Sequence, residues 1–173
     1  MKTASVLITA LVFAGAVLAQ STNPAGQPGT AGASFEKLKS LVGEWEGSMN
    51  EGGKQSPATT SYRLVSGGSA LMNFLGAGTP YEMVTMFHLD NSDLLVTHYC
   101  AAHNQPRFRM VPSSDPNVVT FVFKDATNLS SPSAPHMVGL KITFVDANHH
   151  YQDWTYSEKG QESISRFEFH RKS

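Results

Sequence analysis

The stretch "YQDWTYSEKGQESISRFEFHR" (residues 151–171) decides the fold, because it has the pattern of an antiparallel β-hairpin. Lys159 and Gly160 suit a two-residue turn between two segments that contain aromatic residues. A turn at this place sets Trp154 opposite Ser165. Because side chains alternate between the two faces of a strand, this one pair determines on which face of the hairpin each of the other side chains lies. The stretch therefore predicts both a hairpin and its register.

In this register one face of the hairpin is largely aromatic and the other is charged. Gln152 stands opposite Phe167, and Phe169 extends the same face. On the other face Asp153 stands opposite Arg166, an opposite-charge pair that suits solvent. This alternation is typical of an antiparallel sheet with one face in the core and the other in water.

The rest of the chain continues this pattern back to residue 42. Short runs of strand-forming residues are separated by Gly, Asn, Asp and Pro. They predict strands at 42–49, 58–66, 69–76, 80–89, 93–101, 106–112, 117–125, 137–146, 149–158 and 161–171. Ten consecutive strands with short links favour an all-β fold, an up-and-down antiparallel β-barrel, because closing the sheet removes its exposed edges.

One short helix precedes the strands, in "SFEKLKSL" (34–41). Ser34 is suited to cap its N-terminus. Phe35, Leu38 and Leu41 form an apolar stripe at helical spacing. We therefore expect this helix to lie against the barrel.

The residues before the helix divide into two segments. Residues 1–19 contain a lysine, then an apolar run shorter than the roughly 20 residues that span a bilayer, and end in a small residue, Ala19. This is typical of a secretory signal peptide, so we expect export to the periplasm or the extracellular space. Residues 20–33 are Pro, Gly, Ala and polar, and predict a disordered leader. The domain is then residues 34–173, with no membrane span after removal of the signal.

Charge and cysteine content exclude several classes of protein. The chain has 13 basic and 14 acidic side chains, and removal of Lys2 leaves 12 against 14. So balanced a chain does not attract polyanions over long range, so we expect no nucleic-acid partner. The single cysteine, Cys100, excludes an internal disulfide.

Neither a metal nor a cofactor is expected from the motifs. No P-loop, dinucleotide-binding glycine pattern or zinc-protease motif occurs. The neighbouring His149 and His150 point to opposite faces of a strand and do not converge on one ion. The remaining histidines have no metal-ligand spacing along the chain.

The first and last strands resemble those of a known group of barrels. A short helix followed by Gly43-x-Trp45 in "LVGEWEG" is similar to the start of calycins, the lipocalin and fatty-acid-binding-protein group. The closing "RFEFHRK" (166–172) resembles their last strand, in which a basic residue packs near that tryptophan. The resemblance gives this part to Arg171 or Arg166.

A further segment, "YRLVSGGSALM" (62–72), resembles the second and third strands of bacterial secreted lipocalin-like domains of the DUF1579 type. In pattern the resemblance covers residues 34–171. It implies a pocket inside the barrel and names no ligand.

A second hairpin, "LLVTHYCAAHNQPRFRM", gathers residues that carry chemistry. With a two-residue turn at 103–104, Cys100 stands opposite Arg107 and His98 stands opposite Arg109. These four side chains then share one face of the sheet.

Two interpretations of this hairpin stay open. In the first, Tyr99, Phe108 and Met110 fill the core and the charged side chains face water, the usual place for arginine. In the second, the His, Cys and Arg side chains point into the barrel, where two guanidinium groups would seek an anion. Glu82 on the preceding strand is the internal alternative to a ligand anion. A one-residue slip in the turn interchanges the two faces.

The leading hypothesis is a barrel that binds a small, partly apolar ligand carrying an acidic group. The candidate aromatic walls are Trp45, Tyr99, Phe108, Trp154 and Phe167. The candidate polar contacts are His98, Cys100, Arg107, Arg109 and Glu82. One alternative is an enzyme on the same barrel, with His98 as general base and a thiol role for Cys100. Another is a structural or interaction module with a filled core.

Overall fold

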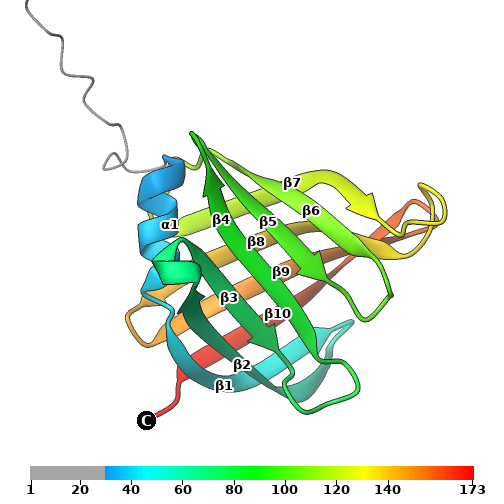
Figure 1. Ribbon diagram of the computed structural model, residues 1–173. Helices are drawn as coiled ribbons and strands as arrows, with labels where there is room; N and C mark the ends of the chain where they lie inside the picture. The colour runs from blue at the N-terminus through cyan, green and yellow to red at the C-terminus, as the bar shows by residue number, and fades with distance from the viewer. Residues whose placement is uncertain (1–29) are drawn as a thin grey trace, which may run out of the picture.

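Residues 30–173 form a closed, ten-stranded antiparallel β-barrel with one α-helix across one end (Figure 1). The structure, a computed structural model, describes residues 30–173. The elements are α1 (Ala31–Lys39), β1 (Gly43–Glu51), β2 (Lys54–Val65), the short 3-10 helix η2 (Ser66–Gly68), β3 (Ala70–Leu75), β4 (Met83–Asp90), β5 (Asp93–Tyr99), β6 (Gln105–Val111), β7 (Val118–Thr127), β8 (His136–Asp146), β9 (His149–Glu158) and β10 (Gln161–Arg171). Each strand pairs with its neighbours in the chain, and β1 pairs with β10 to close the barrel. The predicted up-and-down barrel and all ten predicted strands are confirmed.

The last hairpin has the register that its sequence predicts. Trp154 stands opposite Ser165, and Asp153 stands opposite Arg166. Both carboxylate oxygens of Asp153 accept hydrogen bonds from the Arg166 guanidinium, at 2.6 and 2.9 Å. Burial of Asp153 would raise its pKa, but hydrogen bonds from Arg166 and Lys141 outweigh it and hold the pKa below its ordinary value. The ion pair therefore clips β9 to β10 on the outer face.

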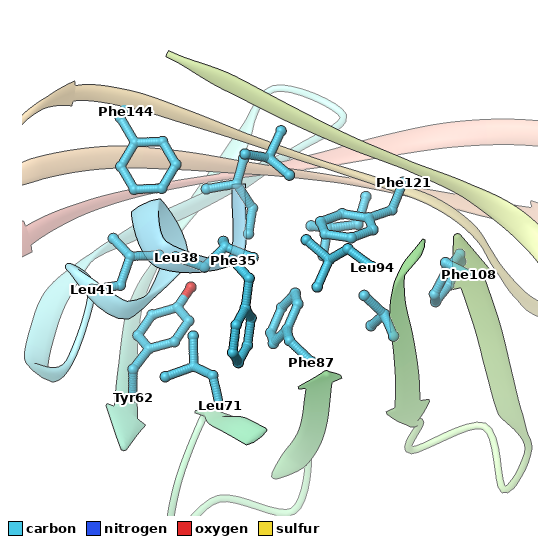
Figure 2. Close-up of a cluster of buried hydrophobic side chains, with 14 of the residues drawn as sticks. Phe35, Leu38, Leu41, Tyr62, Leu71, Phe87, Leu94, Phe108, Phe121 and Phe144 are labelled. Carbon is cyan, nitrogen blue, oxygen red and sulfur yellow. The ribbon is translucent and has the colours of Figure 1, made fainter. Parts of the chain in front are cut away.

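An apolar core fills the end of the barrel beneath α1 (Figure 2). The predicted stripe of Phe35, Leu38 and Leu41 is confirmed, because all three side chains are buried in it. Figure 2 shows Phe35 beside Tyr62 and Phe87, which come from β2 and β4. This end of the barrel is thus closed by side chains.

The helix begins earlier than its sequence predicts. Its N-cap is Thr30, whose hydroxyl accepts a hydrogen bond from the backbone N–H of Ala33, and Ser34 lies within the helix. The segment 31–33 is therefore helical and not part of a disordered leader. The prediction of a leader rested on composition alone. It did not consider that Thr30 can cap a helix and that alanine favours one. The predicted signal peptide, residues 1–19, and the leader up to residue 29 lie outside the described residues.

In the described part of the chain, no helix has the length and apolarity that crossing a bilayer requires.

Arg171 is the basic residue that packs on Trp45, while Arg166 is held by Asp153. The Arg171 guanidinium carbon lies 4.2 Å from the centre of the Trp45 ring. Its nitrogens donate to the carbonyl oxygens of Val42 at 2.9 Å and Ser40 at 2.8 Å. One side chain thus joins the end of β10 to the segment between α1 and β1.

Replacing this guanidinium should loosen the junction. We expect Arg171→Ala to lower the free energy of unfolding by about 2 kcal/mol, because the carbonyl groups of Ser40, Val42 and Ala147 lose a charged donor and Trp45 loses its cation–π contact. Arg171→Lys should restore only part, since an ammonium lacks the planar fork. Urea unfolding monitored by tryptophan fluorescence measures the loss. Arg63→Ala is the control, because Arg63 is exposed and stacks on Phe74 at 5.5 Å. An equal loss in both variants would contradict the assignment.

Candidate ligand-binding site

The predicted register of the second hairpin, β5–β6, is wrong. Arg107 stands opposite Thr97, and Arg109 stands opposite Leu95. The connection is longer than two residues: the N–H of Cys100 donates to the Asn104 carbonyl, and three residues lie between them. An odd shift in register exchanges the two faces of a strand pair.

The two arginines consequently lie outside the barrel. Arg107 and Arg109 are exposed, and the Arg107 guanidinium makes a two-pronged ion pair with Asp125 on β7. Tyr99 shares this outer face and is 51% exposed. Phe108 is in the core and Met110 packs against it, as the first interpretation of the hairpin predicts, whereas Tyr99 is not. The cluster of cations that was to hold an anion inside the barrel does not form.

His98 does point inward, but it is not among the residues that line the cavity at the open end of the barrel, which is described below. Its side chain is fully buried, and its ring packs on Trp154 with centroids 4.4 Å apart. Its Nδ1 and the hydroxyl of Thr85 are 2.9 Å apart, and its Nε2 has no hydrogen-bond partner among the described residues. Burial lowers the pKa of His98 to about 4. A general base must reach its substrate, and this imidazole is covered.

Cys100 and Glu82 lie in loops at the rim. The Sγ of Cys100 accepts a hydrogen bond from the backbone N–H of Ala102 at 3.5 Å. Burial raises the pKa of this thiol, which opposes a thiolate nucleophile. Glu82 precedes β4 rather than lying on it, and its carboxylate accepts from the N–H of Gly78 at 2.7 Å. Neither residue meets the arginines.

A cavity of about 790 Å³ opens at the end of the barrel opposite α1. The loops β3–β4, β5–β6 and β7–β8 lie at this end (Figure 1). Its apolar lining residues are Met49, Pro57, Ala58, Leu75, Met83, Met137, Trp154 and Phe167. Its polar lining residues are Glu51, Ser56, Thr59, Thr79, Tyr81, Tyr156 and Ser165. Gly76 completes the wall. We call this space the mouth cavity.

Buried polar side chains lie beside Trp154, which belongs both to the apolar core and to the wall of the mouth cavity. Trp154 lines the cavity and donates from Nε1 to the amide oxygen of Gln152 at 2.9 Å. The Gln152 amide nitrogen in turn donates to the Tyr62 hydroxyl at 2.7 Å. Across the barrel, the amide of Asn73 donates to the hydroxyl of Thr60 at 2.6 Å. These bonds satisfy buried polar groups and hold Trp154 in one orientation.

Two of the five aromatic walls predicted from the sequence line the mouth cavity, namely Trp154 and Phe167. Trp45 lies in the closed end, where its Nε1 donates to the Leu41 carbonyl at 2.7 Å. Phe108 is fully buried beside Trp154.

The sequence interpretation missed the methionines of the wall. Met49, Met83 and Met137 lie at the ends of β1, β4 and β8 that face the mouth. Three methionines that occur at corresponding ends of strands could have been noticed in the sequence. Whether their side chains point into the barrel could not be predicted, because this depends on the register that each loop sets.

Comparison with known proteins shows which solved structures share this fold, but it does not assign the chain to a family. No protein-family model matches the chain, and no curated protein matches it. Among solved structures, Rv2717c from M. tuberculosis is similar, with a TM-score of 0.54 and 14% identity over 81% of this chain and 98% of that one. A protein of unknown function from the DUF3598 family of Nostoc punctiforme PCC 73102 has a TM-score of 0.53 and 13% identity, over 88% of this chain and 53% of its own length. At such identities the likeness shows a shared barrel fold alone.

Proposed function

We propose that this barrel binds a small, largely apolar molecule in the mouth cavity. The observation that carries the proposal is the cavity itself, about 790 Å³ with walls of methionine, leucine and aromatic side chains. Ligand pockets commonly occupy roughly 300–1,000 Å³ and are lined mainly by apolar groups. A barrel filled by its own side chains would leave no such space.

The methionines in the wall favour a site that accepts apolar ligands of several shapes. Methionine side chains are unbranched and flexible, and they adapt to irregular apolar surfaces. Trp154, held from below by Gln152, gives a rigid aromatic surface at the base of the same space. One rigid surface and several adaptable ones suit a class of related apolar molecules.

The ligand's polar group is expected to be neutral or cationic. The expectation of an acidic group depended on Arg107 and Arg109 in the barrel, and both lie outside it. Among the residues that line the cavity, the one charged side chain is that of Glu51. Its carboxylate accepts a hydrogen bond from Ser165 at 2.9 Å. A carboxylate at the mouth repels an anion.

The proposal includes membership of the calycin type, with the DUF1579-type domains as the suggested relatives. The helix at the closed end and the stack of Arg171 on Trp45 support it. Both features are those that the resemblance in "LVGEWEG" and "RFEFHRK" implies.

Blocking the cavity tests the function. The probe is N-phenyl-1-naphthylamine, a neutral apolar dye whose own fluorescence rises in an apolar site. We expect Ala58→Trp to weaken its binding at least about tenfold, because the indole fills space that the ligand needs, and loss of a few apolar contacts already costs this much. Ile164→Trp is the matched control, since it adds the same side chain at an outer position that is 59% exposed.

Two results would contradict the proposal: absence of dye binding to the wild type, or equal loss in both tryptophan variants. Competition for the bound dye reports the charge preference. Decylamine should displace the dye at lower concentration than decanoate does. The reverse order would reject the role given to Glu51.

A further inference from the structure

A cluster of two histidines and a glutamate lies on the outer face of the barrel, away from the mouth cavity. His149 begins β9, and His170 stands directly opposite it near the end of β10. Glu168 lies two residues before His170, so it shares the outer face of the same strand. His150 points inward and is fully buried, as the alternation of a strand predicts. The cluster thus depends on pairing between strands and not on spacing along the chain.

The three side chains bring their ligand atoms together. The Nε2 of His149 lies 3.1 Å from Oε1 of Glu168, and the Nε2 of His170 lies 3.6 Å from the same oxygen. All three ligand atoms lie within 4.8 Å of one another. Around a tetrahedral ion with bonds of about 2.0–2.1 Å, neighbouring ligand atoms are separated by roughly 3.3 Å. Two of the three separations already match this value.

The contact between His149 and Glu168 has the distance of a hydrogen bond but not its direction. The Nε2 of His149 is buried and has no hydrogen-bond partner among residues 30–173. A nitrogen and a carboxylate oxygen that are close without pointing at each other have the arrangement of ligands that converge on a third atom. The His149 imidazole packs edge-on against Tyr151 at 4.9 Å, and the ring of His170 lies stacked on it at 4.2 Å. An imidazole nitrogen binds a metal ion in the plane of its ring, so the His170 side chain, which is 58% exposed, turns out of this stack when both nitrogens bind one ion.

The carboxylate is available for this role. Within the described residues, the ion-pair partners of Glu168 are these two histidines and no lysine or arginine. Arg166, the nearest arginine along β10, directs its guanidinium to Asp153. Glu168 therefore keeps a lone-pair oxygen free of any fixed cation.

We propose that His149, Glu168 and His170 form a binding site for a divalent transition-metal ion such as Zn²⁺ or Cu²⁺. Two imidazoles and one carboxylate suit these ions, whereas Mg²⁺ and Ca²⁺ require oxygen ligands throughout. Three protein ligands leave at least one coordination position for water, so the site is open. It differs in chemistry and in place from the mouth cavity and does not depend on the function proposed there.

Calorimetric titration of the full chain with ZnCl₂ tests the site. The protein is prepared without a polyhistidine tag and in a Cys100→Ser background, which removes the one thiol. We expect one ion per chain. His149→Ala, His170→Ala and Glu168→Gln should each weaken binding at least about tenfold, since even the loss of an outer-shell partner costs 10–100-fold. His103→Ala, an exposed histidine in the β5–β6 loop, is the matched control and should bind as the parent does.

Electron paramagnetic resonance of bound Cu²⁺ identifies the ligands directly. The parent should show hyperfine splitting from two imidazole nitrogens, and His149→Ala should show it from one. Near-ultraviolet circular dichroism confirms that each variant is folded. Failure of the parent to bind, or binding that survives all three substitutions, would overturn the proposal.

Discussion

Gly47→Ala is expected to lower the free energy of unfolding by about 3 kcal/mol or more, because overpacking against immovable atoms is among the costlier substitutions. A Cβ atom at position 47 would lie 1.9 Å from the carbonyl oxygen of Glu168 and 3.1 Å from the Cα of Phe169. These are backbone atoms of β10, so no side-chain rotation relieves the clash. The strands β1 and β10 would have to separate at the place where the barrel closes.

Gly139→Ala is the matched control for this effect. Gly139 also lies within a strand, β8, but a Cβ there meets the side chain of Thr155 at 3.4 Å, an ordinary contact. We expect its stability to change by less than about 1 kcal/mol, with a contribution from the reduced freedom of the unfolded chain. Urea unfolding of both variants at equal pH makes the comparison. A Gly47→Ala protein as stable as the Gly139→Ala protein would show that the closure is not tight.

Acid should destabilise the protein through His98. Burial lowers the pKa of His98 in the folded protein to about 4, against about 6.5 in the unfolded chain. Between these two values the unfolded state binds the proton and the folded state does not, so stability falls as the pH falls. The difference in pKa corresponds to about 3 kcal/mol, most of which is lost between pH 6.5 and pH 4.

The comparison that isolates His98 uses the slope of stability against pH. His98→Leu removes the titrating group and keeps an apolar side chain against Trp154, so its free energy of unfolding should fall less steeply over this range. The hydroxyl of Thr85 loses a partner, which lowers stability equally at all pH values. Parallel slopes for the parent and His98→Leu would remove His98 as the cause.

The two hairpins explain why the sequence predicts the fold well and the site poorly. In β9–β10 the turn residues Lys159 and Gly160 both have positive φ, and the glycine marks the turn in the sequence. In β5–β6 no glycine marks the turn, and His103 takes the left-handed conformation with φ 63°. That residue ends a three-residue loop, whereas the sequence suggests a two-residue one. An error in loop length leaves the predicted strands correct, but it reverses the prediction of which side chains point into the barrel.

The proposed metal site is the opposite case. Here the predicted register is correct and already places the two histidines opposite each other, but this register was not used to look for a metal site. The turn that sets Trp154 opposite Ser165 also sets His149 opposite His170. Spacing along the chain hides this pair, because the two histidines lie in different strands. The mouth cavity could not be found in this way, since its walls come from strands whose register depends on several unmarked loops.

The closure between β1 and β10 has a consequence for how the protein is made. The hydrogen bond from Arg171 to Val42 joins residues 129 positions apart, and the ladder beside it pairs the first strand with the last. Contacts this distant in sequence form slowly, because a long loop must be ordered before they can stabilise it. During translation, the emerging sheet keeps two free edges until β10 has left the ribosome, and such edges can pair with other chains. The nascent polypeptide is therefore exposed to edge-to-edge association for as long as β1 waits for β10.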